Sequence, residues 1–135
     1  MERAPINADG TLGAFALVPD AALVLPRAGH ASVKLGTWLY VVGGSGANGT
    51  LSSVERAKIN VDGSLGQFAM VPDVALTIAR SGYTIAVIGN LLYVFGGASE
   101  SGADPEMHGC HAAFLTAASC ERVGTGAAAS GNGGC

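Results

Sequence analysis

The chain has 135 residues, enough for one domain with a core, and 13% of them are charged, against about 25% in typical proteins. Its 21 glycines favour short strands joined by tight turns. The net charge of −3, with seven Lys and Arg in all and no run of them, offers little to a phosphate backbone. We therefore expect no nucleic-acid partner.

The amino terminus lacks the charged start, apolar stretch and small-residue cleavage site of a secretory signal. We expect no signal peptide in this chain, and the cell location stays open. Residues 81–98 are uncharged and long enough for a membrane helix, but Gly89-Asn90 divide them where a turn belongs. The matching stretch of the other copy carries His30 and Lys34, so we expect no membrane span.

Sliding the chain along itself reveals one repeat, with Glu2 falling on Glu55 at an offset of 53 residues. The matches keep one register without a gap, which chance does not produce. The matching segments are Glu2-Arg3-Ala4 with Glu55-Arg56-Ala57, Asp9-Gly10 with Asp62-Gly63, Val18-Pro19-Asp20 with Val71-Pro72-Asp73, Arg27 with Arg80, Leu39-Tyr40-Val41 with Leu92-Tyr93-Val94, and Gly43-Gly44 with Gly96-Gly97.

Each copy divides into four short apolar segments separated by glycine-rich or polar residues, the pattern of successive antiparallel strands. In chain order we expect two strands within residues 1–20, four strands at 30–35, 38–42, 54–59 and 67–71, and two more within 83–97. The strand at 38–42 is apolar on both alternating faces, so both must be covered. The expected units are a half blade (1–20), a full blade (30–71) and a half blade (83–97).

The repeat resembles the kelch motif of β-propellers. The resemblance lies in an Arg-x-Gly-His or Arg-x-Gly-Tyr start (Arg27 to His30, Arg80 to Tyr83), followed by a Leu-Tyr-Val-x-Gly-Gly strand. The repeat length is also close to the kelch length of about 50 residues. The resemblance covers residues 1–100 and implies an all-β fold, an incomplete kelch-type β-propeller of four-stranded antiparallel blades.

The two blades or so that the sequence predicts are fewer than the 4 to 8 blades of a typical propeller. Because an unclosed array leaves strand edges and apolar faces uncovered, we expect either a fragment of a larger propeller or self-association through open blade faces. Residues 101–135 lack a third copy of the Glu-Arg-Ala strand, are rich in Gly, Ala and Ser, and are expected to form a disordered or irregular tail. The roles of Cys110, Cys120 and Cys135 in this tail stay open.

Several short motifs suggest chemistry that the repeat argues against. Residues 44–49 fit GxGxxG, but the second copy lacks the middle Gly and no βαβ unit follows. Asn60-x-Asp62-Gly63 resembles a calcium loop but lacks its terminal ligands, so a hairpin turn is expected. His108, Cys110, His111 and Cys120 match no zinc spacing. We expect no metal, no cofactor and no catalytic residue.

Antiparallel alternation places the loops at 43–53 and 72–82 on one face, and long loops on a rigid scaffold usually carry function. Loop residues that differ between the copies are the better specificity candidates. Arg27 and Arg80 recur in both copies, which favours a scaffold role, although they could add cationic donors at the rim. The candidate ligand-binding residues are Arg27, Ser45, Asn48, Thr50, Arg80, Ser99 and Glu100.

Three functional hypotheses remain open from the sequence. The first is a non-enzymatic binding module for a protein or glycan, the commonest role that the kelch resemblance implies. The second is a fragment of a propeller enzyme resembling galactose oxidase, which would require a unique polar cluster that neither copy shows. The third is a truncated product without an independent function.

Overall fold

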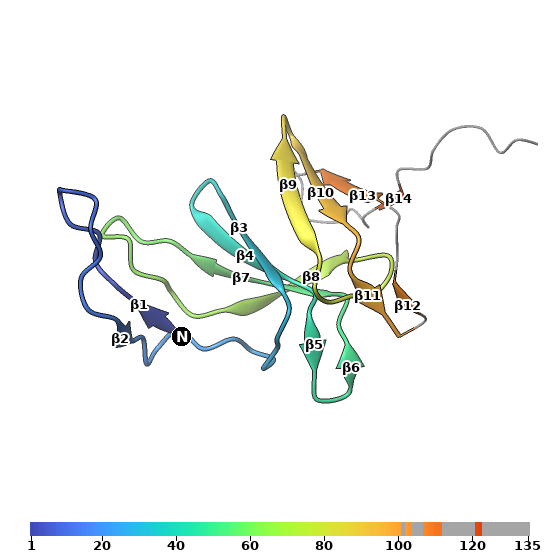
Figure 1. Cartoon of the computed structure of the whole chain (residues 1–135), viewed down its shortest axis with the longest axis horizontal. Helices are drawn as coiled ribbons and strands as arrows, with labels where there is room; N and C mark the ends of the chain where they lie inside the picture. Colours follow the sequence, from blue (N-terminus) through green and yellow to red (C-terminus); the bar gives the residue numbers. More distant parts are fainter. Residues whose placement is uncertain (101, 104–106, 112–120, 123–135) are drawn as a thin grey trace, which may run out of the picture.

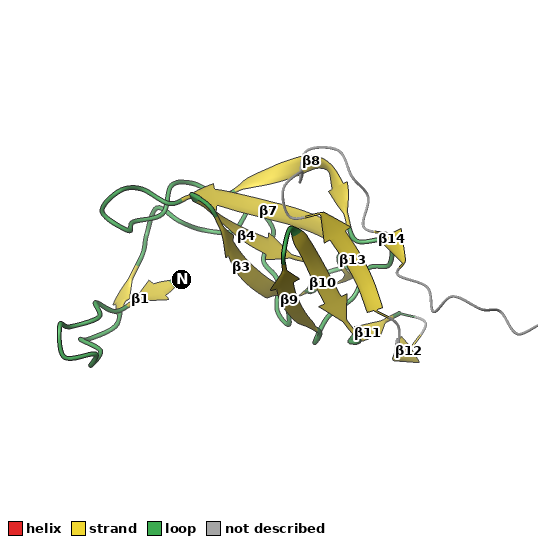
Figure 2. Cartoon of the chain, turned by 90° about the horizontal axis from the view of Figure 1, so that it is seen from above, coloured by secondary structure: helices red, strands yellow, loops and turns green. Residues whose placement is uncertain are grey.

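The computed structural model describes residues 1–100, 102–103, 107–111 and 121–122, and these residues form only strands, turns and loops (Figure 1). Within them no helix is long and apolar enough to cross a membrane. Three units follow one another along the molecule in both views (Figures 1 and 2). The all-β fold expected from the sequence is confirmed.

We name the units by position. The N-terminal half blade contains β1 (Glu2–Arg3) and β2 (Ala16–Leu17). The central blade has the order β3-β4-β7-β8, with β3 (Ala31–Leu35), β4 (Trp38–Val42), β7 (Ser53–Lys58) and β8 (Ala69–Ala75). The C-terminal blade has the order β14-β13-β10-β9, with β9 (Thr84–Ile88), β10 (Leu91–Phe95), β13 (Met107–His111) and β14 (Glu121–Arg122). Two short hairpins, β5 (Ser45–Gly46) with β6 (Gly49–Thr50) and β11 (Ala98–Ser99) with β12 (Gly102–Ala103), complete the set.

The strand pairing repeats with the offset found in the sequence. Glu2 faces Leu17 in the half blade, and Glu55 faces Met70 in the central blade. The two short hairpins and the isolated bridges that precede them also correspond, as do the β3–β4 and β9–β10 pairings. Matching residues therefore occupy matching places in three dimensions.

Turn glycines fix the inner hairpins of both blades. Gly36 and Gly89 open the two-residue turns after β3 and β9 with φ of 58° and 62°. A positive φ is the backbone geometry that such a turn needs and that glycine adopts without strain. The strands that follow then alternate their side chains toward both faces of each blade.

The C-terminal blade differs from the expected half blade, because β13 lies beside β10 and β14 beside β13. β13 keeps the 53-residue register, since Leu91 faces His111 as Trp38 faces Lys58. The sequence match to Glu55-Arg56-Ala57 is lost there, but the exposed edge of β10 still needs hydrogen-bond partners for its backbone. The rest of the expected tail lies outside the described residues.

The outer edge of the central blade contains a bulge that the sequence pattern does not predict. Ser53 faces Ala75, whereas Glu55 faces Met70, so extra residues of β8 loop out between these pairs. Asp73 adopts φ 61° within this bulge, a value that non-glycine residues seldom take. As a result β8 runs to Ala75, beyond the strand expected at 67–71.

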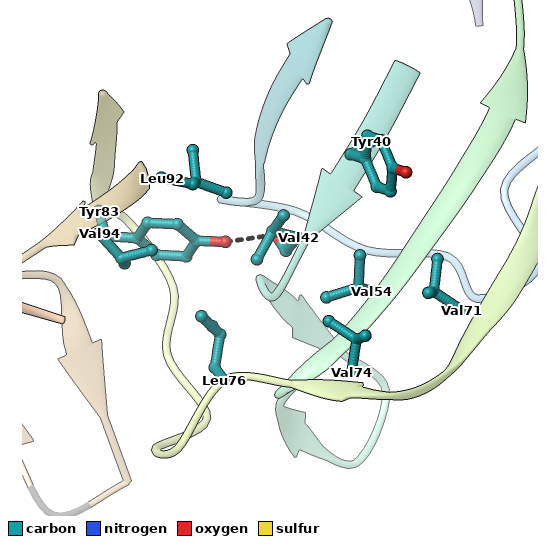
Figure 3. Packing of buried hydrophobic residues seen from close by; sticks show 9 residues of the cluster. All are labelled: Tyr40, Val42, Val54, Val71, Val74, Leu76, Tyr83, Leu92 and Val94. Carbon is teal, nitrogen blue, oxygen red and sulfur yellow. Dashed lines mark hydrogen bonds between the residues drawn. The ribbon is translucent and has the colours of Figure 1, made fainter. Parts of the chain in front are cut away.

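The main core lies between the central and C-terminal blades (Figure 3). Tyr40 and Val42 of β4 pack with Leu92 and Val94 of β10, and the Tyr83 hydroxyl donates a hydrogen bond to the carbonyl of Val42. Burial of the phenol raises the pKa of Tyr83 to about 12. The other members are Val54, Val71, Val74 and Leu76.

A second, smaller cluster lies on the opposite face of the central blade. Val41, Ala57 and Phe68 are buried there against Ala21 from the segment that follows the half blade. Both faces of β4 are thus covered, as its two-sided apolar sequence requires. β4 is therefore the middle layer between two packed clusters.

Candidate functional site

The two kinds of loops lie on opposite faces of the molecule. Figure 1 shows the β3–β4 and β9–β10 turns at the top and the β5–β6 and β11–β12 hairpins at the bottom. The connection from β8 to β9 reaches the hairpin side, because Leu51 and Ser52 form backbone hydrogen bonds with Arg80 and Leu76. The face with the two hairpins, which we call the loop face, is the one that the sequence selected for binding.

Arg27 is not at the rim of this face. Its side chain is fully buried and forms an ion pair with Glu55, with Nη2 2.5 Å from Oε1. Nη1 donates to the carbonyls of Gly43 and Ser53 at 2.8 and 3.1 Å. The Glu55 carboxylate also accepts the backbone N–H groups of Val24 and Leu25 at 2.7 and 3.0 Å. This network joins residues 24–27 to the end of β4 and to β7. Arg27 therefore stabilises the blade and does not face a ligand.

Arg80 occupies the equivalent place in the C-terminal blade. Only 1% of the residue is exposed, and Nη1 donates to the carbonyl of Gly96 at 2.7 Å, as Arg27 does to Gly43. The expectation of cationic donors at the rim is therefore corrected for both arginines. The physical reason is that each guanidinium has carbonyl acceptors inside its own blade, at a fixed distance along the repeat.

Three of the candidate residues do come together, around an open hollow of about 310 Å³ between the two blades. Thr50 comes from β6, Ser99 is the last residue of β11, and Glu100 follows it. The described lining residues are Thr50, Ile78, Ala79, Ser99 and Glu100.

The side chain of Glu100 reaches across the blade junction to the β5–β6 hairpin. A Cβ placed on Gly49 would lie 2.1 Å from Glu100 Oε1, so the carboxylate rests against this glycine. Gly49 also has φ +113°, a conformation that glycine adopts freely. The glycine therefore leaves room for a carboxylate at the edge of the hollow.

The remaining two candidates lie outside the hollow lining. Ser45 is in β5, where its backbone exchanges hydrogen bonds with Ala28 at 2.7 and 2.9 Å. Asn48 is exposed at the tip of the hairpin between β5 and β6. Ser45 thus holds the hairpin on the blade, and Asn48 extends the loop face into solvent.

The sequence did not select Ile78 and Ala79, which form the apolar part of the lining. They lie within residues 72–82, the connection assigned to this face, where the sequence prediction considered polar residues only. Their position in the repeat, directly before Arg80, could have identified them as lining residues. The corresponding residues of the first copy, Leu25 and Pro26, precede Arg27 in the same way.

The motifs with competing interpretations have structural roles. Residues 44–49 form the β5–β6 hairpin and are not followed by a helix. Asp62 accepts hydrogen bonds from the backbone N–H and hydroxyl of Ser64 at 3.0 and 2.7 Å, and Asp9 does the same with Thr11. These side-chain bonds lower the pKa of both carboxyl groups. Each Asp closes a turn. Among the described residues no three metal-ligating side chains cluster.

Comparison with models of protein families gives a match. Residues 26–56 match the model of the kelch motif, and this span begins just before Arg27 and ends in β7. No curated protein matches the chain. Repeats of this kind are typically non-enzymatic interaction modules. The chain is thus an all-β protein with a kelch motif at residues 26–56, and the antiparallel sheets that repeat around this motif in one register are consistent with kelch-type blades.

Proposed function

We propose that this chain is a non-enzymatic kelch-type interaction module that binds a protein partner on its loop face. The observation that carries the proposal is the hollow between the β5–β6 hairpin and the end of β11, where Thr50, Ser99 and Glu100 meet. Loops held by a rigid scaffold are the usual place for recognition. The scaffold here is the pair of packed blades.

The chemistry of the hollow favours a short peptide segment with one basic side chain. Ile78 and Ala79 provide apolar contact, Thr50 and Ser99 provide hydroxyl groups, and Glu100 is the one charged residue in the described lining. A Lys or Arg side chain could place its charge at Glu100 and its aliphatic part over Ile78. The described lining has no aromatic ring on which a sugar could stack, so we favour a protein over a glycan.

The proposal also includes a larger propeller around these two blades. Two packed blades leave the outer faces of the array open, and stacked repeats generally need about three or more units for stability. We therefore infer that the chain acts as part of a larger propeller. In this setting the loop face of these two blades contributes one portion of the binding surface.

Selection from a random phage-displayed peptide library on the full chain tests the loop-face site. We expect the selected peptides to pair a basic residue with an apolar neighbour. Glu100→Lys should weaken their binding at least about tenfold, the effect of losing a central contact. Asp20→Lys makes the same charge change at an exposed residue outside the hollow lining and should leave binding unchanged. Equal binding to both variants would refute the site.

A further inference from the structure

The N-terminal half blade repeats the outer strands of the central blade but leaves their buried side chains exposed. Glu55 and Phe68 are 0% and 6% exposed in the central blade. Their counterparts at the 53-residue offset are Glu2, which is exposed, and Phe15, which is 64% exposed. In the described residues β1 has β2 on one side and no inner hairpin on the other. The half blade thus exposes side chains that are buried in a complete blade.

The place of the missing inner hairpin is a pocket of about 590 Å³ beside the central blade. Leu39 and Val41 line it from β4, and Met1 lines it from the half blade. On the other side of the molecule, the counterparts of Leu39 and Val41 are Leu92 and Val94, which are buried against β4. The first pair of residues therefore faces the position that an inner hairpin of a preceding blade would occupy.

The C-terminal blade displays a matching hairpin surface. Tyr93 and Phe95 correspond to Tyr40 and Val42, which are 6% and 3% exposed in the core between the blades. Tyr93 and Phe95 are only partly buried, and their rings stack at a centroid distance of 6.2 Å. Ile88, at the end of β9, is 61% exposed. This surface corresponds to the one that the central blade uses against its neighbour.

We propose that copies of this chain associate head to tail, with the β9–β10 hairpin of one copy in the pocket of the next. In this complex β1 of the second copy pairs with β10 of the first, along the edge that β13 occupies in the single chain. The pairing of β4 with β7 gives the register. By analogy Tyr93 faces Arg3 and Val94 faces Glu2 of the second copy.

The sequence at this edge favours the second copy over the chain's own β13. Glu2-Arg3-Ala4 repeats Glu55-Arg56-Ala57, whereas the residues of β13 at these positions are His108, Gly109 and Cys110. In the shared blade, Glu2 lies where Glu55 lies in the central blade. Its carboxylate can then meet the guanidinium of Arg80 as Glu55 meets that of Arg27.

The two surfaces belong to opposite ends of the chain, so the interface is heterologous. Such an interface leaves one free end of each kind in every open complex, and the complex closes into a ring when the rotation between copies permits. Each copy would contribute about two blades. A propeller of 4 to 8 blades would then need about two to four copies.

Light scattering of the full chain over a range of concentrations tests the association. We expect the mass of the wild-type complex to rise to at least that of two chains. Glu2→Arg blocks the pocket end and Tyr93→Lys blocks the hairpin end, and each should weaken association at least about tenfold. Asp20→Arg is the matched control for Glu2→Arg, because its counterpart Asp73 stays exposed in the complete blade.

Mixing the two blocked variants gives the sharper test. Each retains one intact end, so an equimolar mixture should form complexes of two chains and nothing larger. Circular dichroism must first show wild-type strand content. If Tyr93→Lys does not fold, Ile88→Lys replaces it, since that side chain is already exposed. The proposal is overturned if the wild type stays a single chain at all concentrations, if both blocked variants associate like it, or if the mixture forms no complex.

Discussion

The buried Arg27–Glu55 pair allows a direct test of how the repeat is stabilised, by the substitution Glu55→Gln. The side chain keeps its size but loses the charge opposite Arg27, whose Nη2 lies 2.5 Å from Oε1. Both side chains are fully buried, so water cannot replace the lost partner. Breaking a buried ion pair by removing one charge costs about 3–5 kcal/mol. The amide oxygen can still accept from Val24 or Leu25, which places the expected loss at the lower end, about 3 kcal/mol.

Urea denaturation at pH 7, at one protein concentration for all variants, measures this loss as a change in the free energy of unfolding. The chain contains its own control. Asp20→Asn removes one carboxylate charge at an exposed position, so it should change stability by less than about 0.5 kcal/mol. A cost of under about 1 kcal/mol for Glu55→Gln, or equal costs for the two substitutions, would refute the argument that this network stabilises the blade.

Two further predictions concern the junction between the blades. The pKa of Tyr83 is raised to about 12, against about 10 unfolded, so burial favours the protonated phenol. The stability that the buried phenol contributes is complete below pH 10 and is lost as the pH rises toward 12, by up to about 1.4 kcal/mol per pH unit. Urea titrations at several pH values should show this slope in the free energy of unfolding, and Tyr83→Phe should reduce it. Gly44 has φ +98°, and an added Cβ would lie 2.7 Å from the carbonyl oxygen of Ala28, whereas at Gly10, with φ +83°, it would meet nothing within 4 Å. Gly44→Ala should therefore lower the midpoint of urea unfolding more than Gly10→Ala, and equal shifts would show that crowding contributes nothing there.

The sequence predicted the central blade well because its signals are local. The turn glycines, the alternation in β3 and β4 and the Asp62-Gly63 turn each depend on a few neighbouring residues, and the repeat confirms each of them twice. The apolar pattern also predicted the register of strands far apart in the chain, since a shift of one residue would move the apolar side chains of β4 to the wrong faces.

The parts that the sequence missed depend on contacts between units. β13 lies beside β10 without the Glu-Arg-Ala match, because an unpaired strand edge accepts backbone partners of almost any sequence. The bulge at Asp73 and the lining role of Ile78 arise from the packing of the β8–β9 connection against the neighbouring blade. The periodicity of residues within a single strand does not predict these contacts.

Repetition itself separates scaffold from candidate site in this chain. Arg27 and Arg80 recur at the same position and are both buried in their own blades, so their identity in the two copies reflects a need of every blade. The hollow has the opposite pattern. At the 53-residue offset Thr50 corresponds to Ala103, Ser99 to Gly46 and Glu100 to Ala47, so no second copy of this set of side chains arises from the repeat.

A binding site at a blade junction can therefore be unique although its scaffold is repeated. The hollow takes Thr50 from one copy and Ser99 and Glu100 from the next, and neither blade could form it alone. Substitutions at these positions leave the buried Arg27 network intact, because Arg27 donates to the carbonyls of Gly43 and Ser53, to the Ser53 hydroxyl and to Glu55, and none of these lines the hollow. Specificity on this face can thus change while the fold stays the same.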